Sequence, residues 1–344
     1  MSKTNPGRFF EDYRLGEVIR HAVPRTLGQG ERALCHALYP ARHALNSSDA
    51  FAQACGLKSA PLDDWLVFHT VFGKTVPDIS LNAVANLGYA EGRWRAPVWP
   101  GDTLSAESEV IGLKLNSNRA SGVVWVRTRG VNQHGDTVLD YVRWVMVRTR
   151  DPNATMPETA IPELAPALGA GDLVLPPGLD FGDYDFALAG EPHRWGDYEP
   201  GEIIDHVDGV TIEEAEHMLA TRLWQNTAKV HFDATFREDG RRLIYGGHVI
   251  SMARALSFNG LANAQLVVAL NGGAHANPCF AGDTVRAWSQ VLDRAETARP
   301  GIGALRLRTV AMRDGGRAGA LRGEDGRYLP EVLLDLDYWA LIPR

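Results

Sequence analysis

The chain has 344 residues, of which 45% are hydrophobic and 22% are charged, and its formal net charge is −7. This length predicts two domains of about 150 residues rather than a single core. Scattered glycines and prolines exclude a collagen-like or low-complexity chain. The lack of a basic stripe argues against a nucleic-acid partner. No run approaches 18 apolar residues, so we expect no membrane span.

The chain begins with a short polar segment. It contains Lys3 and Arg8 but no apolar stretch of the kind found in secretory signals, so we expect a cytoplasmic protein. The three cysteines, Cys35, Cys55 and Cys279, lack metal-binding spacing and have apolar neighbours. In a reducing compartment we expect them to be small core residues and not nucleophiles.

Two blocks of sequence occur twice, in the same order and at nearly the same spacing. Residues 11–21 reappear as residues 196–206, and residues 100–110 reappear as residues 281–291. Solenoid repeats have periods of only about 20 to 50 residues. The much longer spacing therefore indicates two copies of one domain.

A shorter repeat marks the end of each copy. Residues 139–144 are echoed near the C-terminus, where Leu336 opens a similar sequence. We therefore expect one copy at residues 1–150 and a second at residues 185–344. The proline-rich segment 151–184 is expected to be a linker.

Each copy shows the same succession of predicted elements. In the first copy, periodic apolar residues predict helices over about 30–45 and 62–73, and alternation at 123–129 predicts a strand. The corresponding elements of the second copy are expected at about 211–224, 245–258 and 305–310.

Local signals refine these elements. Thr211 followed by Glu214 predicts a capping box at the start of a helix. The Gly-Asp-Thr sequences at 101–103 and 282–284 predict turns that lead into strands. A long helix wrapped by a curved antiparallel sheet is the hot-dog fold, and two such halves usually pair edge to edge. We therefore predict an α+β protein with a tandem (double) hot-dog fold.

The strongest chemical signal lies in the second copy. Residues 225–233, followed by residues 245–248 and a helix, resemble the signature of the (R)-specific enoyl-CoA hydratases, the MaoC-like hot-dog family. In that signature an Asp precedes a His by five residues, and a later Gly donates its backbone N–H to the thioester oxygen. The resemblance places His231 at the family His, Gly247 at the oxyanion Gly and Asn226 at the family Asp.

The resemblance covers nearly the whole chain. The matching strings are residues 4–12, 140–148, 193–198, 241–251 and 336–341. They resemble one branch of the family closely, a branch whose acyl-CoA substrate carries a free carboxylate. The resemblance thus implies a hydratase that acts on a CoA thioester.

The chemistry of such a hydratase explains the residue types. Hydration places the water oxygen on Cβ and a proton on Cα, while negative charge builds on the thioester oxygen. A histidine suits the proton transfers, and a preorganised N–H suits the oxyanion. We expect no metal and no redox cofactor, since CoA is part of the substrate.

Asn226 departs from the family pattern, because an amide cannot accept a proton. An Asp about 5 Å from a substrate carboxylate would cost about 3 kcal/mol at an effective dielectric near 20. Our hypothesis is that His231 is the principal acid and base and that Asn226 is a positioning group. Asp233, or a carboxylate of the first copy, remains open as an alternative base.

Four more residues are candidate substrate-binding groups. Arg254 lies two turns into the predicted Gly247 helix, in an apolar run, and is the first candidate to pair with a carboxylate. Arg222 is the second candidate, and His248 and Asn259 complete the set.

The first copy lacks the motif. No acid or amide lies five residues before His43, and residues 61–64 stand where the second copy has its glycines. We expect this copy to be catalytically silent and to shape the substrate tunnel. Two alternatives stay open: a general fatty enoyl-CoA hydratase, and a non-catalytic acyl-thioester-binding protein. We expect a homodimer, because hot-dog sheets tend to associate.

Overall fold

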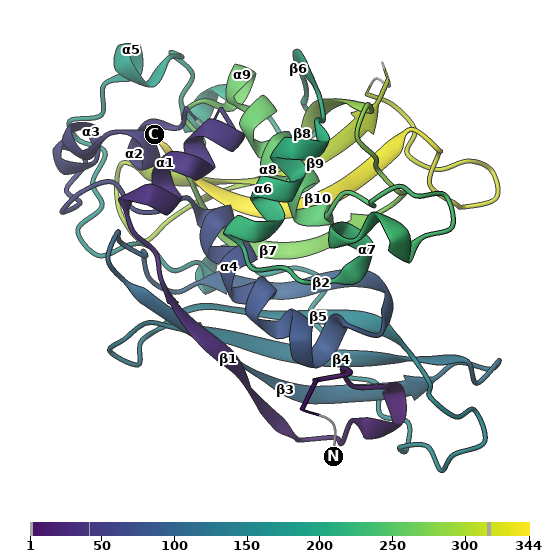
Figure 1. The fold of residues 1–344 in the computed structure, drawn as a ribbon. Helices are drawn as coiled ribbons and strands as arrows, with labels where there is room; N and C mark the ends of the chain where they lie inside the picture. The colour runs from purple at the N-terminus through teal and green to yellow at the C-terminus, as the bar shows by residue number, and fades with distance from the viewer. Residues whose placement is uncertain (1–2, 41, 315–317) are drawn as a thin grey trace.

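The computed structural model describes residues 3–40, 42–314 and 318–344. Within these residues, ten strands form a single antiparallel sheet (Figure 1). The strands are β1 (Val18–Thr26), β2 (Ala83–Trp94), β3 (Thr103–Leu115), β4 (Ser121–Val131), β5 (Thr137–Arg148), β6 (Ile203–Thr211), β7 (Leu266–His275), β8 (Thr284–Glu296), β9 (Ile302–Arg313) and β10 (Val332–Pro343).

The strand order shows two similar halves joined edge to edge. It runs β1-β3-β4-β5-β2 through the first half and β7-β10-β9-β8-β6 through the second. At the centre, Gly92 of β2 pairs with Leu270 of β7, and Arg93 pairs with Ala269. This pairing removes one open edge from each half. The predicted double hot-dog fold is therefore confirmed.

One long helix lies against each half of the sheet. Helix α4 (Asp64–Thr75) packs on β1, β3 and β5, and helix α8 (Gly246–Leu256) packs on β6, β8, β9 and β10. The two helices also contact each other, and Figure 1 shows them on the same side of the sheet. Their bounds agree with the helices predicted at 62–73 and 245–258.

Shorter helical segments fill the connections. They are η1 (Phe10–Asp12), α1 (Gln29–Leu38), α2 (Ala44–Ser47), α3 (Asp49–Ala54), η2 (Val76–Ser80), η3 (Ala170–Asp172), α5 (Phe186–Ala189), η4 (Trp195–Asp197), α6 (Glu214–Leu223), α7 (Lys229–Phe232), η5 (Ala234–Phe236) and α9 (Phe258–Leu261). The helix predicted over about 30–45 is therefore divided, because α1 ends at Leu38.

The predicted capping box at Thr211 is wrong by two residues. Helix α6 begins at Glu214, and the backbone N–H of Glu213 donates to Glu216 Oε1 at 3.1 Å. Thr211 ends β6, and its hydroxyl lies 2.8 Å from that of Thr284 on the neighbouring strand. The hydroxyl is thus engaged across the sheet and is not available to cap the helix.

The two Gly-Asp-Thr turns form as predicted. Gly101 and Gly282 have φ angles of 106° and 94°, a region that favours glycine. In each turn the following aspartate accepts a backbone N–H three residues earlier, at 2.8 and 2.9 Å. Each turn leads directly into a strand, β3 or β8.

The duplication extends to buried polar contacts. In the first half, His21 Nε2 lies 2.8 Å from Ser108 Oγ, which lies 2.8 Å from Thr128 Oγ1. The second half repeats both contacts, at 2.8 Å each, through His206, Ser289 and Thr309. Their occurrence in both halves indicates a structural role.

The segment between the halves is packed against the protein. Leu168, Leu179 and Phe181 are buried in a core cluster that also contains Trp339 of β10. The Trp339 indole N–H donates to the Leu168 carbonyl at 3.0 Å. Apolar burial along residues 151–184 therefore fixes this segment's path.

The cysteines are buried and free. Burial raises the pKa of Cys55 to about 11 and that of Cys279 to about 12, so these thiols stay protonated near neutral pH. Separately, none of the described helices is long and apolar enough to cross a membrane.

Close packing between the halves gives a first prediction. A Cβ atom on Gly73 of α4 would lie 1.9 Å from the carbonyl oxygen of Trp224, which follows α6. We expect Gly73→Ala to lower the free energy of unfolding by about 1–3 kcal/mol, measured by urea denaturation, because backbone must move. Gly30→Ala on α1 is the control, since its Cβ meets nothing within 4 Å. Equal stabilities of the two variants would contradict this packing.

Candidate active site

His231 lies on the short helix α7, which follows α6 and precedes α8 in the chain. Its Nδ1 lies 2.7 Å from the carbonyl oxygen of Leu243, so Nδ1 carries the ring proton and donates it. Nε2 then holds the free lone pair that a general base needs. Burial lowers the pKa of His231 to about 4, which keeps the ring neutral near pH 7.

Asn226 lies in the turn between α6 and α7, and it is buried. Its Oδ1 accepts the N–H of Ala228 at 3.1 Å, and its own backbone N–H donates to Thr221 at 3.0 Å. These bonds fix the turn that leads to His231. The side-chain NH₂ group remains as a donor, so this position offers N–H groups and no proton acceptor of carboxylate type.

Gly247 is the second residue of α8, where a backbone N–H has no acceptor inside the helix. A Cβ atom there would lie 2.3 Å from Tyr245 Cε1 and 2.6 Å from His69 Nδ1. At Gly246, a Cβ would lie 2.3 Å from His275 Cε1. Only glycine therefore fits at either position. The helix N-terminus also favours a negatively charged oxygen nearby.

Histidines surround the start of α8: they are His69, His217, His231, His248 and His275. The ring centroid of His217 lies 6.3 Å from that of His231 and 5.9 Å from that of His248. Burial is the main cause that lowers the pKa of His217 to about 3 and that of His275 to about 4, and neighbouring imidazoles add to it. In the described part of the chain, no group of three or more ligating side chains is arranged to hold a metal ion.

His248 is held by one residue from each half. Its Nδ1 lies 2.7 Å from the Tyr39 hydroxyl, and its Nε2 lies 3.4 Å from Glu216 Oε1. Both ring nitrogens therefore face protein groups. This predicted substrate-binding residue lies at the start of α8, beside Gly247, with its ring orientation fixed.

Arg254 lies near the opposite end of α8 from Gly247. Seven residues separate the two, which is about 10 Å along the helix axis. The buried guanidinium donates to the carbonyl oxygens of Ala264 and, at 3.2 Å, Gln265. Arg254 also lines a small pocket with Tyr39, His43 and Ser251, and so lies one helical turn beyond the residue that contacts His69.

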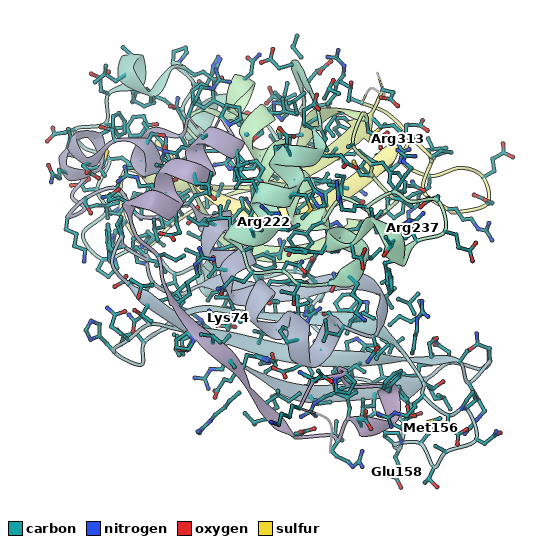
Figure 2. The ribbon with its side chains drawn as sticks, viewed as in Figure 1. Lys74, Met156, Glu158, Arg222, Arg237 and Arg313 are labelled. Atoms are coloured by element: carbon teal, nitrogen blue, oxygen red, sulfur yellow. The ribbon has the colours of Figure 1, made fainter. Side chains whose placement is uncertain are left out.

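The two other predicted substrate-binding residues also lie outside the histidine cluster. The Asn259 carbonyl accepts from His206 Nδ1 at 2.7 Å, beyond the C-terminal end of α8. Arg222 is exposed near the end of α6, on the face of the molecule seen in Figure 2. Of the predicted set, His231, Asn226, Gly247 and His248 therefore share one region.

The first half contributes side chains that the sequence analysis did not single out. Tyr39, the residue after α1, reaches His248, and His69 of α4 reaches Gly247. His69 is a polar residue within a helix whose residues after Asp64 are all buried, and this signal was available in the sequence. His217 of the second half was missed as well.

The expected correspondence of the helix starts needs a correction. The sequence predicts that residues 61–64 correspond to the Tyr-Gly-Gly-His sequence, but α4 begins at Asp64 and α8 begins at Gly246. Trp65, with 1% of its surface exposed, therefore stands at the position of Gly247. The first half therefore has a large side chain where the second half has a glycine covered by the rings of Tyr245 and His69.

Comparisons with known structures support this architecture. A crystal structure of a MaoC domain dehydratase from Chloroflexus aurantiacus aligns with a TM-score of 0.97 and 57% identity, covering 100% of this chain and 99% of that one. A Mycobacterium tuberculosis protein with a double hot-dog fold aligns at 0.77 and 24% identity, covering 98% and 99%. Fold and site together define a MaoC-like hydratase with a double hot-dog fold.

Sequence comparisons identify the family. Residues 2–318 match the family model described as mesaconyl-CoA hydratase, and the chain belongs to this family. A mesaconyl-CoA hydratase of Cereibacter sphaeroides is 77% identical over 342 residues, covering 99% of this chain and all of the relative. A β-methylmalyl-CoA dehydratase of Chloroflexus aurantiacus is 58% identical over 350 residues, covering 100% and 99%.

The neutral histidines predict acid sensitivity. His206, His217, His231 and His275 have pKa values of about 3 to 4 in the folded protein, whereas an unfolded histidine titrates near 6.5. Between pH 6.5 and 4 the unfolded state therefore binds more protons, and stability falls as the pH falls. We expect a loss of about 1.4 kcal/mol per pH unit for each such histidine, measured by urea denaturation. The histidines should contribute no slope between pH 7.5 and 8.5, and a flat profile from pH 7.5 to 5 would refute this account.

Proposed function

We propose that this protein catalyses the reversible hydration of mesaconyl-CoA to β-methylmalyl-CoA, a step of the ethylmalonyl-CoA pathway of acetate assimilation. The relative named mesaconyl-CoA hydratase, at 77% identity, is the observation that carries this proposal. The relative named for the reverse reaction, a dehydratase, is 58% identical and supports the same substrate pair. The substrate is a CoA thioester, and the protein is a hydro-lyase.

His231 is the principal acid and base of the proposed reaction. Its Nε2 takes a proton from water as the water oxygen attacks Cβ, and the proton is then returned to Cα. The free lone pair on Nε2, which follows from the 2.7 Å bond between Nδ1 and Leu243, supports this role. No metal or redox cofactor is needed for these transfers.

Gly247 stabilises the negative charge that builds on the thioester oxygen. Its N–H lies in the first turn of α8 and has no acceptor inside the helix, so it can donate to a thioester oxygen. A preorganised donor of this kind is worth about 3 to 4 kcal/mol in the transition state. The helix N-terminus adds to the effect.

Asn226 is a positioning group. Mesaconyl-CoA carries a carboxylate on Cβ, beside the point of water attack, and an amide N–H can donate to it or to the water. The rival base, Asp233, is exposed, and its carboxylate accepts from the backbone and the hydroxyl of Thr235 at 2.9 and 2.7 Å. This local bonding favours His231 over Asp233 as the base.

We also infer a cytoplasmic homodimer. Hot-dog sheets tend to associate, and the reaction involves neither a membrane nor a nucleic acid. Light scattering at micromolar concentration measures the assembly directly, and the mass of a single chain would reject the dimer.

The general base gives a direct test. We expect His231→Gln to lower kcat at least 100-fold, because the amide cannot take the proton from water. Asp233→Asn is the matched control and should keep kcat within about twofold. The assay follows the loss of absorbance at the enoyl-thioester band with mesaconyl-CoA. The reverse pattern would assign the base to Asp233.

Asn226 controls the choice of substrate. We expect Asn226→Asp to lower kcat/KM about 100-fold for mesaconyl-CoA, because two carboxylates about 5 Å apart repel each other by about 3 kcal/mol. Crotonyl-CoA lacks the carboxylate, so kcat/KM for this substrate should not fall in the same way. Equal losses on the two substrates would contradict this explanation. Unchanged turnover of mesaconyl-CoA by Asn226→Ala would reject the positioning role.

The same assay separates the remaining alternatives. Wild-type activity on crotonyl-CoA alone indicates a general enoyl-CoA hydratase. Binding of both thioesters without turnover indicates an acyl-thioester-binding protein. Asn226 at the position of the family Asp argues against the first, and the free lone pair on His231 Nε2 argues against the second.

A further inference from the structure

His69 of the first half lies directly against the oxyanion glycine of the second half. The Nδ1 and Cε1 atoms of its ring would lie 2.6 and 2.7 Å from a Cβ placed on Gly247. Its Nε2 lies 3.1 Å from the hydroxyl of Ser251, one helical turn further along α8. The ring therefore lies along α8 with Nδ1 toward the helix start and Nε2 toward Ser251.

The environment of Nδ1 is unusual for a buried polar atom. His69 has 0% of its surface exposed, and no described residue forms a hydrogen bond with Nδ1. Nearly all buried polar groups in proteins have such a partner, so an unpaired one beside a catalytic position indicates a group that pairs with substrate. Tyr245 and Trp224 hold the ring, with centroid distances of 5.7 and 4.4 Å.

The ring is neutral, so one of its two nitrogens carries a proton. Burial, aided by His275 and His248 and opposed by an interaction with the backbone of Gly247, holds the pKa of His69 well below its ordinary value. A serine hydroxyl can donate to Nε2, and the single ring proton then lies on Nδ1. A neutral imidazole N–H can polarise a carbonyl oxygen as an electrophile without carrying a positive charge.

We propose that the Nδ1–H of His69 is a second donor to the thioester oxygen, next to the N–H of Gly247. This inference rests on the proposed hydratase function. It makes the oxyanion site a joint product of both halves, with the backbone donor from α8 and the side-chain donor from α4. Ser251 is then a positioning residue that selects the ring tautomer.

Three variants separate this role from simple packing. His69→Leu removes both nitrogens, His69→Asn keeps an amide donor near Nδ1, and His69→Gln keeps one near Nε2. We expect His69→Leu to lower kcat on mesaconyl-CoA about 100- to 1,000-fold, with KM changed less than threefold. His69→Asn should retain at least tenfold more activity than His69→Gln. Wild-type turnover of mesaconyl-CoA is measured first and tests the proposed function separately.

The carbonyl of the bound thioester provides a second readout, which a packing role would not change. In a His231→Ala background, which suppresses turnover, we expect the C=O stretch of bound mesaconyl-CoA to lie below its solution value. Adding His69→Gln should move it back toward that value, and adding His69→Asn should not. With wild-type turnover established, equal frequencies for these two double variants would overturn the proposal even if His69→Leu fails to fold.

Discussion

The organisation of this protein depends on the close approach of α4 to the first turn of α8. No side chain fits on Gly246 or Gly247, because the rings of His275, Tyr245 and His69 occupy that space. The backbone N–H of Gly247 in this first turn has no acceptor inside the helix, and it is the donor proposed to meet a substrate carbonyl. The edge-to-edge pairing of β2 with β7 places the two helices side by side. The same pairing therefore forms the continuous sheet and brings α4 to the site.

Burial of several uncharged imidazoles is the second physical feature of the site. Their low pKa values keep them neutral, so His231 can accept a proton and the surroundings do not compete for the substrate's negative charge. This environment has a cost in stability at acid pH, because each ring gains a proton when the chain unfolds. Burial of uncharged imidazoles thus favours proton transfer by His231 and lowers the stability of the fold at acid pH.

The two halves share their fold but differ at one position of the long helix. Both keep the strand order, the Gly-Asp-Thr turns and the chain of His, Ser and Thr hydrogen bonds. When α4 is aligned with α8, however, the second residue of the helix is Trp65 in the first half and Gly247 in the second. The first half thus has an indole where the second half has no side chain. The first half instead supplies Tyr39 and His69 to its neighbour's site.

Most of the fold was predictable because it is encoded by local patterns that occur twice. Alternating apolar residues, helical periodicity and turn glycines act over a few residues, so they indicated the long helices and the strands. The missed details were those with a distant competitor. Thr211 fails to cap α6 because Thr284, 73 positions away, engages its hydroxyl.

The sequence by itself determined the duplicated hot-dog architecture, the family, and the local motif of Asn226, His231 and Gly247. Only the tertiary structure decided which side chains of the first half complete that motif. His69 lies 178 positions before Gly247, and nothing local links the two. They meet because the halves pair edge to edge and set α4 against α8. Contacts of this kind depend on how whole elements pack, and sequence periodicity carries no information about them.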